Sequence, residues 1–392
     1  DIGTNKTICI NYQKKKNSGL KILSWNHKKT EGIIRSKIVE PKSVSETINQ
    51  IFSDFGELNF ENKNIYSNFT DTELMLTKNY NEISMGGLPI NKRDIRKIYM
   101  KNLKDSLKIN RTLLHSMPLN FNVDNKVYSE NPLGINCKKL GLSSINFLTN
   151  NTLIKDRKEL FMQSNLVMDE IIDSGLASAI ACLTDSEKKI GITCIDLGAG
   201  SSKIVTFFEN NIELIHNISI GGNDVTNDIC RGLDLPKEIS EYIKIVHGSL
   251  SHSSNDKIRL DLNSGFNNKI ITHDLLNGII KPRYEEILEI IRDKLEENLI
   301  SKISLNKIVF TGGAAQIQGL LELAFKVFNR DTKLAYPNSH DMEFNKPEFS
   351  TIWGLLKIMS DNNLKSIVSS KLRKQKFSLL ERLDNWITES VL

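Results

Sequence analysis

The segment Asp196-Leu-Gly-Ala-Gly-Ser-Ser (196–202) is the most informative part of this 392-residue chain, because the chain opens on a related one, Asp1-Ile-Gly-Thr-Asn-Lys-Thr (1–7). After each copy come two short apolar runs separated by a polar turn, a pattern that predicts a β-hairpin. These runs are Ile8–Tyr12 and Leu20–Trp25 after the first copy, and Lys203–Phe208 and Ile212–Ile220 after the second. A hairpin repeated behind a repeated turn predicts two related α/β lobes.

A helical pattern follows each hairpin, at Ser43–Phe55 in the first copy and Asn223–Cys230 in the second. A strand-like run before the turn is present only in the second copy, at Ile190–Ile195. Because an Asp-x-Gly turn of this kind usually follows a strand, we expect a short N-terminal piece to precede Asp1 in the whole protein.

A segment of different character separates the two copies. It contains a strand candidate near Asn81–Met85 and an amphipathic helix near Lys92–Leu107, which predict a small α+β insert. The second copy continues into a long amphipathic helix, a strand and a further helix, at Arg283–Leu299, Lys307–Phe310 and Ile317–Phe328. The predicted organisation is a first lobe (1–71 and 151–188) with the insert (72–150), a second-lobe core (189–222 and 286–359) with an outer subdomain (223–285), a polar basic linker (360–376) and a terminal amphipathic helix (377–392).

The composition is that of an ordinary globular protein, with 39% hydrophobic and 25% charged residues. The net charge of +5 is small for this length and the basic residues are scattered among acidic ones, which argues against nucleic acid as a main partner. The five cysteines are widely spread without a CxxC pair, as expected for reduced thiols rather than disulfides or a zinc site. No apolar run approaches the roughly 18 residues needed to cross a bilayer.

Both Asp-x-Gly turns have the residue types that a polyphosphate site needs. Successive backbone N–H groups in a tight turn form an anion nest, and glycine lets a phosphate approach the backbone closely. The carboxylates of Asp1 and Asp196 can hold Mg²⁺ through water. The alternative, that Asp-x-Gly only marks a tight hairpin, is the better explanation of one copy alone. Two copies in matching contexts favour phosphate binding.

A third glycine turn, Thr311-Gly-Gly-Ala, stands between an apolar strand and the start of a helix. This arrangement brings backbone amides and the helix dipole close to a ligand. Two Asp-x-Gly turns followed by a Gly-Gly turn match, in this order, the nucleotide-binding signature of the actin, Hsp70 and sugar-kinase superfamily. The match predicts a two-lobed, actin-like ATPase fold of the α/β class, with ATP and Mg²⁺ in the cleft between the lobes.

Within this superfamily the chain resembles the bacterial cell-division family FtsA from its first residue to its C-terminus. The resemblance rests on the position of the insert and on Asn131-Pro-Leu-Gly, Gly175-Leu-Ala-Ser, Glu241-Tyr-Ile-Lys, His247-Gly, Ile280-Lys-Pro-Arg-Tyr and Thr311-Gly-Gly-Ala-Ala-Gln-Ile-Gln-Gly-Leu. It implies that the nucleotide-binding residues are Gly3, Thr4, Asn5, Lys6, Gly198, Ala199, Gly200, Ser201, Ser202, Glu241, Lys244, Gly312, Gly313, Ala314 and Gln316.

In that scheme the two Asp-x-Gly turns line the phosphates, and Asp1 and Asp196 face Mg²⁺. The Gly-Gly turn borders the adenosine, with Glu241 and Lys244 near its ribose and base. The alternative for this last pair is an exposed i,i+3 ion pair of little consequence.

The same resemblance implies protein partners. The C-terminal tail of the tubulin-like protein FtsZ would bind the outer subdomain at a surface that includes Lys281 and Arg283. Further copies of the chain would join head to tail, and later division proteins would bind the insert. Arginine offers a planar fork for carboxylates and backbone carbonyls. The alternative is that Arg283 only pairs with Glu285 or Glu286 and caps its helix.

Hydrolysis of ATP needs a residue that orients the attacking water. Actin relatives that hydrolyse ATP place Glu or Gln just before a helix of small residues, and Asp173-Ser-Gly-Leu-Ala-Ser occupies that place here. Ser174, the nearest residue, orients water poorly and cannot act as a base at neutral pH. Asp173 is the alternative if the register shifts by one residue. We predict that ATP is bound and is hydrolysed slowly or not at all.

The C-terminal segment has the pattern of a helix that lies on a membrane. Its apolar face and the bordering tryptophan comprise Phe377, Leu380, Leu383, Trp386, Ile387 and Val391, and the basic flank before it contains Lys371, Arg373, Lys374 and Lys376. A basic flank and an amphipathic helix with tryptophan suit an anionic bilayer surface, and FtsA proteins end in such an anchor. Glu381, Asp384 and Glu389 make the polar face less basic than in a strong anchor. The alternative is a helix that docks on its own core or on a partner.

Taken with the resemblance, these features predict an ATP-binding adaptor that self-associates and tethers the FtsZ ring to the cytoplasmic face of the bacterial inner membrane at the division site. An active phosphotransferase or chaperone of the same superfamily is one alternative, but no sugar pocket or substrate domain is visible in the sequence. A pilus-assembly actin homologue is another, although it would lack the terminal anchor.

Overall fold

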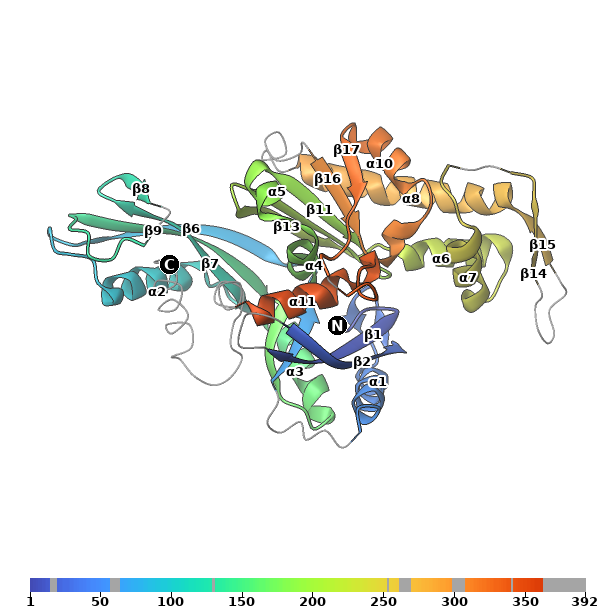
Figure 1. Ribbon diagram of the computed structural model, residues 1–392, viewed down its shortest axis with the longest axis horizontal. Helices are drawn as coiled ribbons and strands as arrows, with labels where there is room; N and C mark the ends of the chain where they lie inside the picture. Colours follow the sequence, from blue (N-terminus) through green and yellow to red (C-terminus); the bar gives the residue numbers. More distant parts are fainter. Residues whose placement is uncertain are drawn as a thin grey trace.

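The computed structural model describes residues 1–14, 20–56, 64–128, 131–251, 254–260, 269–297, 307–339 and 341–361. The predicted terminal helix (377–392), most of the basic linker (360–376) and the end of the predicted helix Arg283–Leu299 lie outside the described residues. Two lobes lie next to each other, and a smaller unit projects from one end of the molecule (Figure 1). None of the helices in the described ranges is both long and apolar enough to cross a bilayer.

The second lobe is built on a five-stranded sheet with the order β13-β12-β11-β16-β17. Its strands are β11 (Ile192–Leu197), β12 (Ser202–Phe208), β13 (Asn211–Ile218), β16 (Lys307–Thr311) and β17 (Asp331–Leu334). The predicted hairpin corresponds to β12 and β13, which pair antiparallel. β11 runs parallel to β16 with Asp196 opposite Thr311. Because parallel strands end at the same edge of a sheet, this register places the second Asp-x-Gly turn beside the Gly-Gly turn.

Helices pack against this sheet and extend into the outer subdomain. They are α6 (Gly222–Leu233), α7 (Lys237–His247), α8 (His273–Glu296) and α10 (Leu320–Phe328), with the short helix η1 (Gly313–Gln316) and the hairpin β14 (Lys257–Leu260) and β15 (Lys269–Thr272). α8 begins ten residues before the predicted Arg283, at a point where Thr272 accepts a hydrogen bond from the amide of Leu275. Pro282 lies inside the helix, and buried side chains on both sides of it, such as Ile280 and Tyr284, hold the helix in place despite its cost.

The first lobe repeats the hairpin, with β1 (Lys6–Lys14) antiparallel to β2 (Leu20–Lys29). It also contains β3 (Ile33–Ile34), β4 (Lys37–Ile38), α1 (Pro41–Ser53), β5 (Ile65–Phe69), α3 (Asn151–Gln163), β10 (Met168–Asp173), α4 (Ser174–Cys182) and α5 (Asp185–Ile190). β5 and β10 pair in parallel, separately from β1 and β2. Among the described residues, a groove of about 820 Å³ is lined by residues of β1, β5, α1 and α11 (Ser350–Ser360).

The chain returns to the first lobe near its C-terminal end, through η2 (Pro347–Phe349) and α11 (Ser350–Ser360). The predicted second-lobe core includes residues 286–359, but α11 packs against α4 and β5 of the predicted first lobe. Ile352, Leu355 and Ile358 join an apolar core that contains Ile172 of the first lobe and continues to Val309 of the second-lobe sheet. The sequence pattern of α11 shows an apolar helix, but a pattern does not specify the surface that the helix covers.

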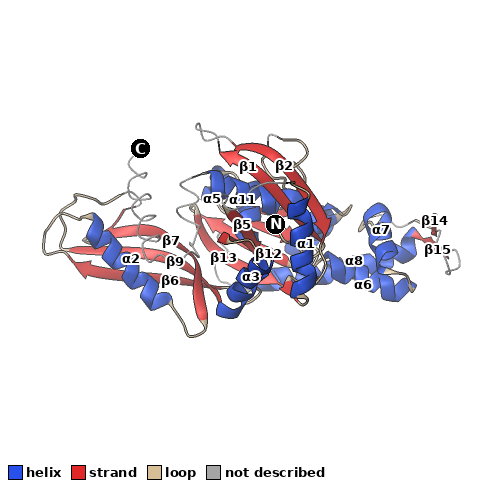
Figure 2. Ribbon diagram, turned by 90° about the horizontal axis from the view of Figure 1, so that it is seen from below, coloured by secondary structure: helices blue, strands red, loops and turns tan. Residues whose placement is uncertain are grey.

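The insert is a four-stranded sheet with one helix, α2 (Lys92–Ser106), on one face (Figure 2). Its strands are β6 (Met75–Ser84), β7 (Arg111–Val123), β8 (Lys126–Tyr128) and β9 (Lys139–Asn150), in the order β6-β9-β7-β8. α2 starts where predicted because Asn91 and Asp94 form a capping box at its N-terminus. Ile95, Ile98 and Phe121 belong to an apolar core of the insert's own residues.

Candidate functional site

A cleft of about 620 Å³ lies between the two lobes. Most of the predicted nucleotide-binding residues line it, together with both aspartates: Asp1, Gly3, Thr4, Asn5, Lys6, Asp196, Gly198, Ala199, Gly200, Ser201, Glu241, Lys244, Gly312, Gly313, Ala314 and Gln316. Ser202 is not among the lining residues, because its side chain turns away and its hydroxyl donates to the carbonyl of Ile220 at 2.8 Å. Segments far apart in the sequence therefore meet at one cavity.

The second Asp-x-Gly turn is held by the start of α6. The amide of Gly222 donates to the carbonyl of Gly198 at 3.0 Å, and the amide of Asn223 donates to that of Ala199 at 2.8 Å. Within the part of the chain that the structure describes, the amides of Ala199 and Gly200 donate to no other group. Unpaired amides on a fixed turn form a concavity that suits an anion.

The first turn lies directly against the second. A Cβ atom on Gly200 would lie 2.3 Å from Oγ1 of Thr4, so only glycine fits between the two turns. A tight hairpin of the first lobe reinforces this contact: its turn residue Ser36 shares a hydrogen bond with Ser201, with 2.8 Å between the hydroxyl oxygens. Beside it, Arg35 donates to the Asp224 carboxylate at 2.6 Å. These contacts connect β3–β4 of one lobe to the phosphate turn and α6 of the other.

The Gly-Gly turn and α7 form the other end of the cleft. Lys244 is 8% exposed and donates to the carbonyl of Gly222 at 3.0 Å and to the carboxylate of Glu241 at 2.6 Å. The alternative of an exposed pair is therefore wrong for this lysine. Burial lowers the pKa of Lys244, and the neighbouring carboxylate opposes that shift. The three N–H donors of Lys244 are used within the chain, so the Glu241 carboxylate is the member of the pair that can accept a hydrogen bond from a ribose or base at the cavity wall.

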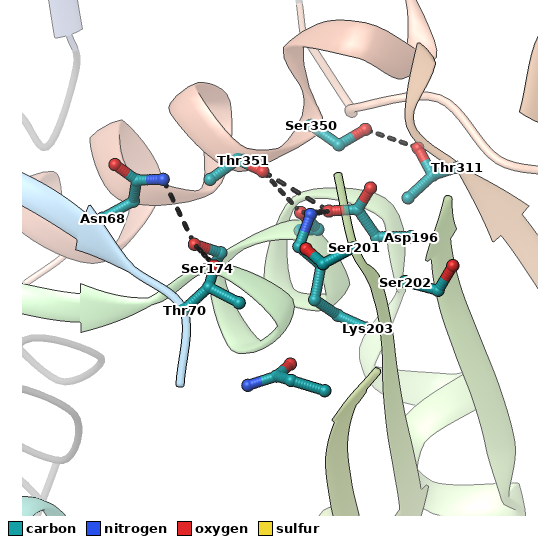
Figure 3. A network of polar contacts seen from close by, with 12 residues as sticks. Asn68, Thr70, Ser174, Asp196, Ser201, Ser202, Lys203, Thr311, Ser350 and Thr351 are labelled. Atoms are coloured by element: carbon teal, nitrogen blue, oxygen red, sulfur yellow. Dashed lines mark hydrogen bonds and ion pairs between the residues drawn. The ribbon is translucent and has the colours of Figure 1, made fainter. Parts of the chain in front are cut away.

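Asp196 lies at the centre of a polar network (Figure 3). Its Oδ2 accepts a hydrogen bond from Ser178 at 2.7 Å and lies 3.5 Å from both Oγ1 of Thr351 and Nζ of Lys203. Its Oδ1 packs against Gly312, where a Cβ atom would approach to 2.3 Å.

These neighbours do not fit a magnesium ion at this carboxylate, because an ammonium and hydroxyl hydrogens already face it. The described residues also contain no group of three or more His, Cys, Asp or Glu side chains arranged to hold a metal.

Ser174, and not Asp173, lines the cleft. Its hydroxyl accepts from Thr70 at 2.8 Å and from Asn68 at 3.1 Å, and it donates to the carbonyl of Phe69 at 2.9 Å. Asp173 is buried below it, where it accepts from the amide of Leu176 at 2.9 Å and so caps α4. Burial raises the pKa of Asp173 to about 6. The alternative register, with Asp173 at the cleft, therefore has no support in the geometry.

The two residues of the predicted partner surface on α8 differ in their contacts. Lys281 is exposed. Arg283 places its guanidinium against the Asp228 carboxylate of α6, with 3.0 Å from one terminal nitrogen, and also contacts Glu286. Its planar fork is therefore already used within the chain. The contact with Glu286 agrees with the alternative of a pair within the helix, and Asp228 is a further partner.

The cleft lining also includes residues that were not predicted from the sequence, among them Ser36, Thr70 and Lys203. For Lys203 a signal existed, since a lysine followed by the apolar residues Ile204 and Val205 interrupts a buried strand. Ser36 and Thr70 lie in short polar stretches that resemble any surface turn. Nothing in the local pattern of these two distinguishes them from other hydroxyl residues.

Two segments of the chain match known protein families. Residues 193–354 match the family described as "Cell division protein FtsA", and residues 72–146 match the "SHS2 domain inserted in FTSA". Together the two segments make up more than half of the chain. The chain belongs to the FtsA family. It is 26% identical over 377 residues to the cell division protein FtsA of Rhizobium meliloti, an alignment that covers 91% of this chain and 85% of that protein.

Solved structures agree with an actin-like fold for this FtsA-family chain. It resembles a chain of the PilM–PilN type IV pilus biogenesis complex with a TM-score of 0.63 at 14% identity, covering 92% of this chain and 96% of the other. It resembles MreB 5 of Spiroplasma citri bound to AMPPNP with a TM-score of 0.53 at 15% identity, covering 91% and 94%. The predicted family and two-lobed fold are confirmed, and the chain is an actin-like protein of bacterial cell division.

Proposed function

We propose that this FtsA-family chain is an ATP-binding adaptor that links FtsZ filaments to the cytoplasmic face of the inner membrane at the division site. The observation that supports the proposal best is the cleft, where two phosphate-type turns from different lobes meet with Thr4 against Gly200. A ligand with several phosphates fits between such turns, because it can accept from the amides of both.

The nucleotide would lie with its phosphates on the two turns and its adenosine at the Gly-Gly turn. Glu241 and Lys244 are fixed at that end by their own hydrogen bonds, so they present a defined surface to the ribose and base. Magnesium enters this proposal only as a companion of the nucleotide, bound to its phosphates, because the Asp196 carboxylate already faces Lys203 and two hydroxyl groups.

Closure of the cleft is the step that nucleotide binding would control. Arg35 and Asp224, Ser36 and Ser201, and Asn5 and Asn223 form contacts between the lobes, each of which is lost when the cleft opens. A ligand that bridges both turns stabilises the closed state, and it shifts the equilibrium by its difference in affinity for the two states. The closed state would favour head-to-tail self-association. Slow turnover, expected from Ser174, would keep the closed state long-lived.

Attachment to the membrane would come from the terminal helix, residues 377–392. Burial of its apolar face drives binding, at roughly 1.5–3 kcal/mol for each large side chain that is fully buried. Ordering a short helix offsets much of this gain. One copy should therefore bind reversibly, and a polymer that presents many tails should bind firmly.

The FtsZ tail would bind the outer subdomain (223–285), and later division proteins would bind the insert. Because Arg283 is engaged with Asp228 and Glu286, the exposed Lys281 is the better test of the surface. We expect Lys281→Glu to weaken binding of an FtsZ tail peptide in fluorescence anisotropy. Arg283→Glu should also disturb the packing of α6 on α8, so its effect alone does not identify the surface. Unchanged affinity for Lys281→Glu would contradict this part of the proposal.

The experiment that tests the proposal as a whole is co-sedimentation with anionic vesicles, with and without ATP. Full-length protein should bind the vesicles, and a variant that ends at residue 376 should not. Trp386→Glu places a charge beside the apolar face and should release the protein while ATP binding persists. Asn385→Glu adds the same charge on the opposite face of the helix and serves as the matched control. Equal sedimentation of the Trp386 and Asn385 variants would refute the anchor.

A further inference from the structure

Lys203 brings a positive charge into the wall of the cleft. It belongs to β12, where it pairs with Asp196 of the neighbouring strand β11. Its side chain is 11% exposed. Its Nζ lies next to the second phosphate turn, since a Cβ atom on Gly198 would lie 2.8 Å from it. Figure 3 shows this side chain beside Asp196 and Ser201. The ammonium thus borders the surface where the phosphates are proposed to lie.

The hydrogen-bonding capacity of this ammonium is not used within the described chain. A lysine ammonium has three N–H donors. Its nearest acidic group, Oδ2 of Asp196, is 3.5 Å away, longer than the roughly 2.7–2.9 Å of a charge-assisted hydrogen bond. Among the described residues no hydrogen bond from Lys203 is found, although Lys244 in the same cleft makes three. A nearly buried cation with free donors is costly unless a ligand accepts from it.

The carboxylate beside it cannot use this charge fully. Oδ2 of Asp196 already accepts from Ser178, and Oδ1 packs against Gly312. One negative and one positive charge stand side by side, so the pair has no net charge to attract a divalent cation. Because the ammonium makes no hydrogen bond to the carboxylate, its N–H donors can interact with an anion that enters from the cleft.

We infer that Lys203 is a phosphate-binding residue, which supplies on the protein the positive charge that a magnesium ion at Asp196 would otherwise provide. The inference rests on the proposed binding of ATP and adds a residue and a charge balance to it. Lysine suits the role, because its compact ammonium acts as a point charge toward phosphate oxygens. ATP should then bind with little dependence on magnesium.

Isothermal titration with ATP, in magnesium and in EDTA, tests the inference on the full chain. Wild type should bind in both, with similar affinity. Lys203→Met keeps the length of the side chain and should lose about ten- to hundredfold in EDTA, the loss expected for hydrogen bonds to a charged group, and less in magnesium. Lys357→Met is the matched control, because that half-buried ammonium donates to the carbonyl of Ile180 away from the cleft lining. It should bind as wild type does.

A second variant separates phosphate binding from a purely structural role, in which Lys203 only neutralises Asp196. The double variant Asp196→Asn with Lys203→Met removes both charges, so no carboxylate is left unpaired. If Lys203 binds phosphate, the double variant still loses affinity in EDTA. Recovery of wild-type affinity in the double variant, or unchanged affinity in folded Lys203→Met, overturns the inference. Failure of wild type to bind ATP in either buffer would instead overturn the proposed function.

Discussion

Gly312→Ala tests whether the Gly-Gly turn is shaped by its contact with the second phosphate turn. Gly312 has φ of 90° and ψ of 161°, a region that is essentially restricted to glycine. A Cβ atom there would lie 2.3 Å from Oδ1 of Asp196 and 2.5 Å from the carbonyl oxygen of Leu197. The backbone conformation should cost about 1–3 kcal/mol, and the forced displacement of a packed neighbour about 1–3 kcal/mol more.

Gly313→Ala provides the matched control one residue later. A Cβ atom on Gly313 would meet nothing closer than Cβ of Glu348 at 3.8 Å, an ordinary contact, and φ at this position is not in the left-handed range. Its effect should stay within about 0.5 kcal/mol or be slightly stabilising.

The two variants are compared by the midpoint of urea unfolding followed by circular dichroism. The midpoint is the appropriate quantity, because a two-lobed chain need not unfold in one step. Gly312→Ala should unfold at clearly lower urea than Gly313→Ala and should bind ATP more weakly, since the displaced turn borders the cleft. Equal midpoints and equal ATP affinities would refute the reasoning.

Three further predictions concern the phosphate turns and the base of α4. Gly200→Val should abolish ATP binding in titration calorimetry, because its side chain would push Thr4 and the first turn away; a folded variant with wild-type affinity would contradict the assignment. Wild type should release phosphate from ATP far more slowly than a motor ATPase, and Ser174→Glu should raise the rate by adding a group that orients water; fast wild-type turnover would show that the role of Ser174 is misread. Because the folded pKa of Asp173 is raised to about 6, the folded state holds more protons than the unfolded state between about pH 4 and 6, and stability falls as pH rises through this window. Asp173→Asn should remove this pH dependence of the free energy of unfolding. The stability of the variant relative to wild type should therefore improve by on the order of 3 kcal/mol from pH 4 to pH 7. Parallel pH profiles of the two proteins in urea unfolding would argue against this role of Asp173.

The elements that are encoded locally could be predicted from the sequence. The two hairpins follow from alternating apolar residues between turn residues, and the start of α2 follows from the capping pattern at Asn91. The Asp-x-Gly and Gly-Gly turns are local as well, because glycine is needed wherever the backbone must come close to another group. Their order along the chain was sufficient to predict a two-lobed nucleotide fold, because each turn carries its own signature.

Contacts between distant segments were decided by the tertiary structure alone. The sequence leaves open whether Asp173 or Ser174 reaches the cleft, and the pairing of β10 with β5 fixes Ser174 there while Asp173 caps α4. Arg283 has the same local pattern whether it waits for a partner or binds Asp228, which lies 55 positions earlier in the chain. The sequence shows Lys203 as a lysine at the start of an apolar strand, but only the antiparallel register places it opposite Asp196. The role of each of these side chains depends on which distant residues the fold brings into contact with it, and no local sequence pattern specifies those residues.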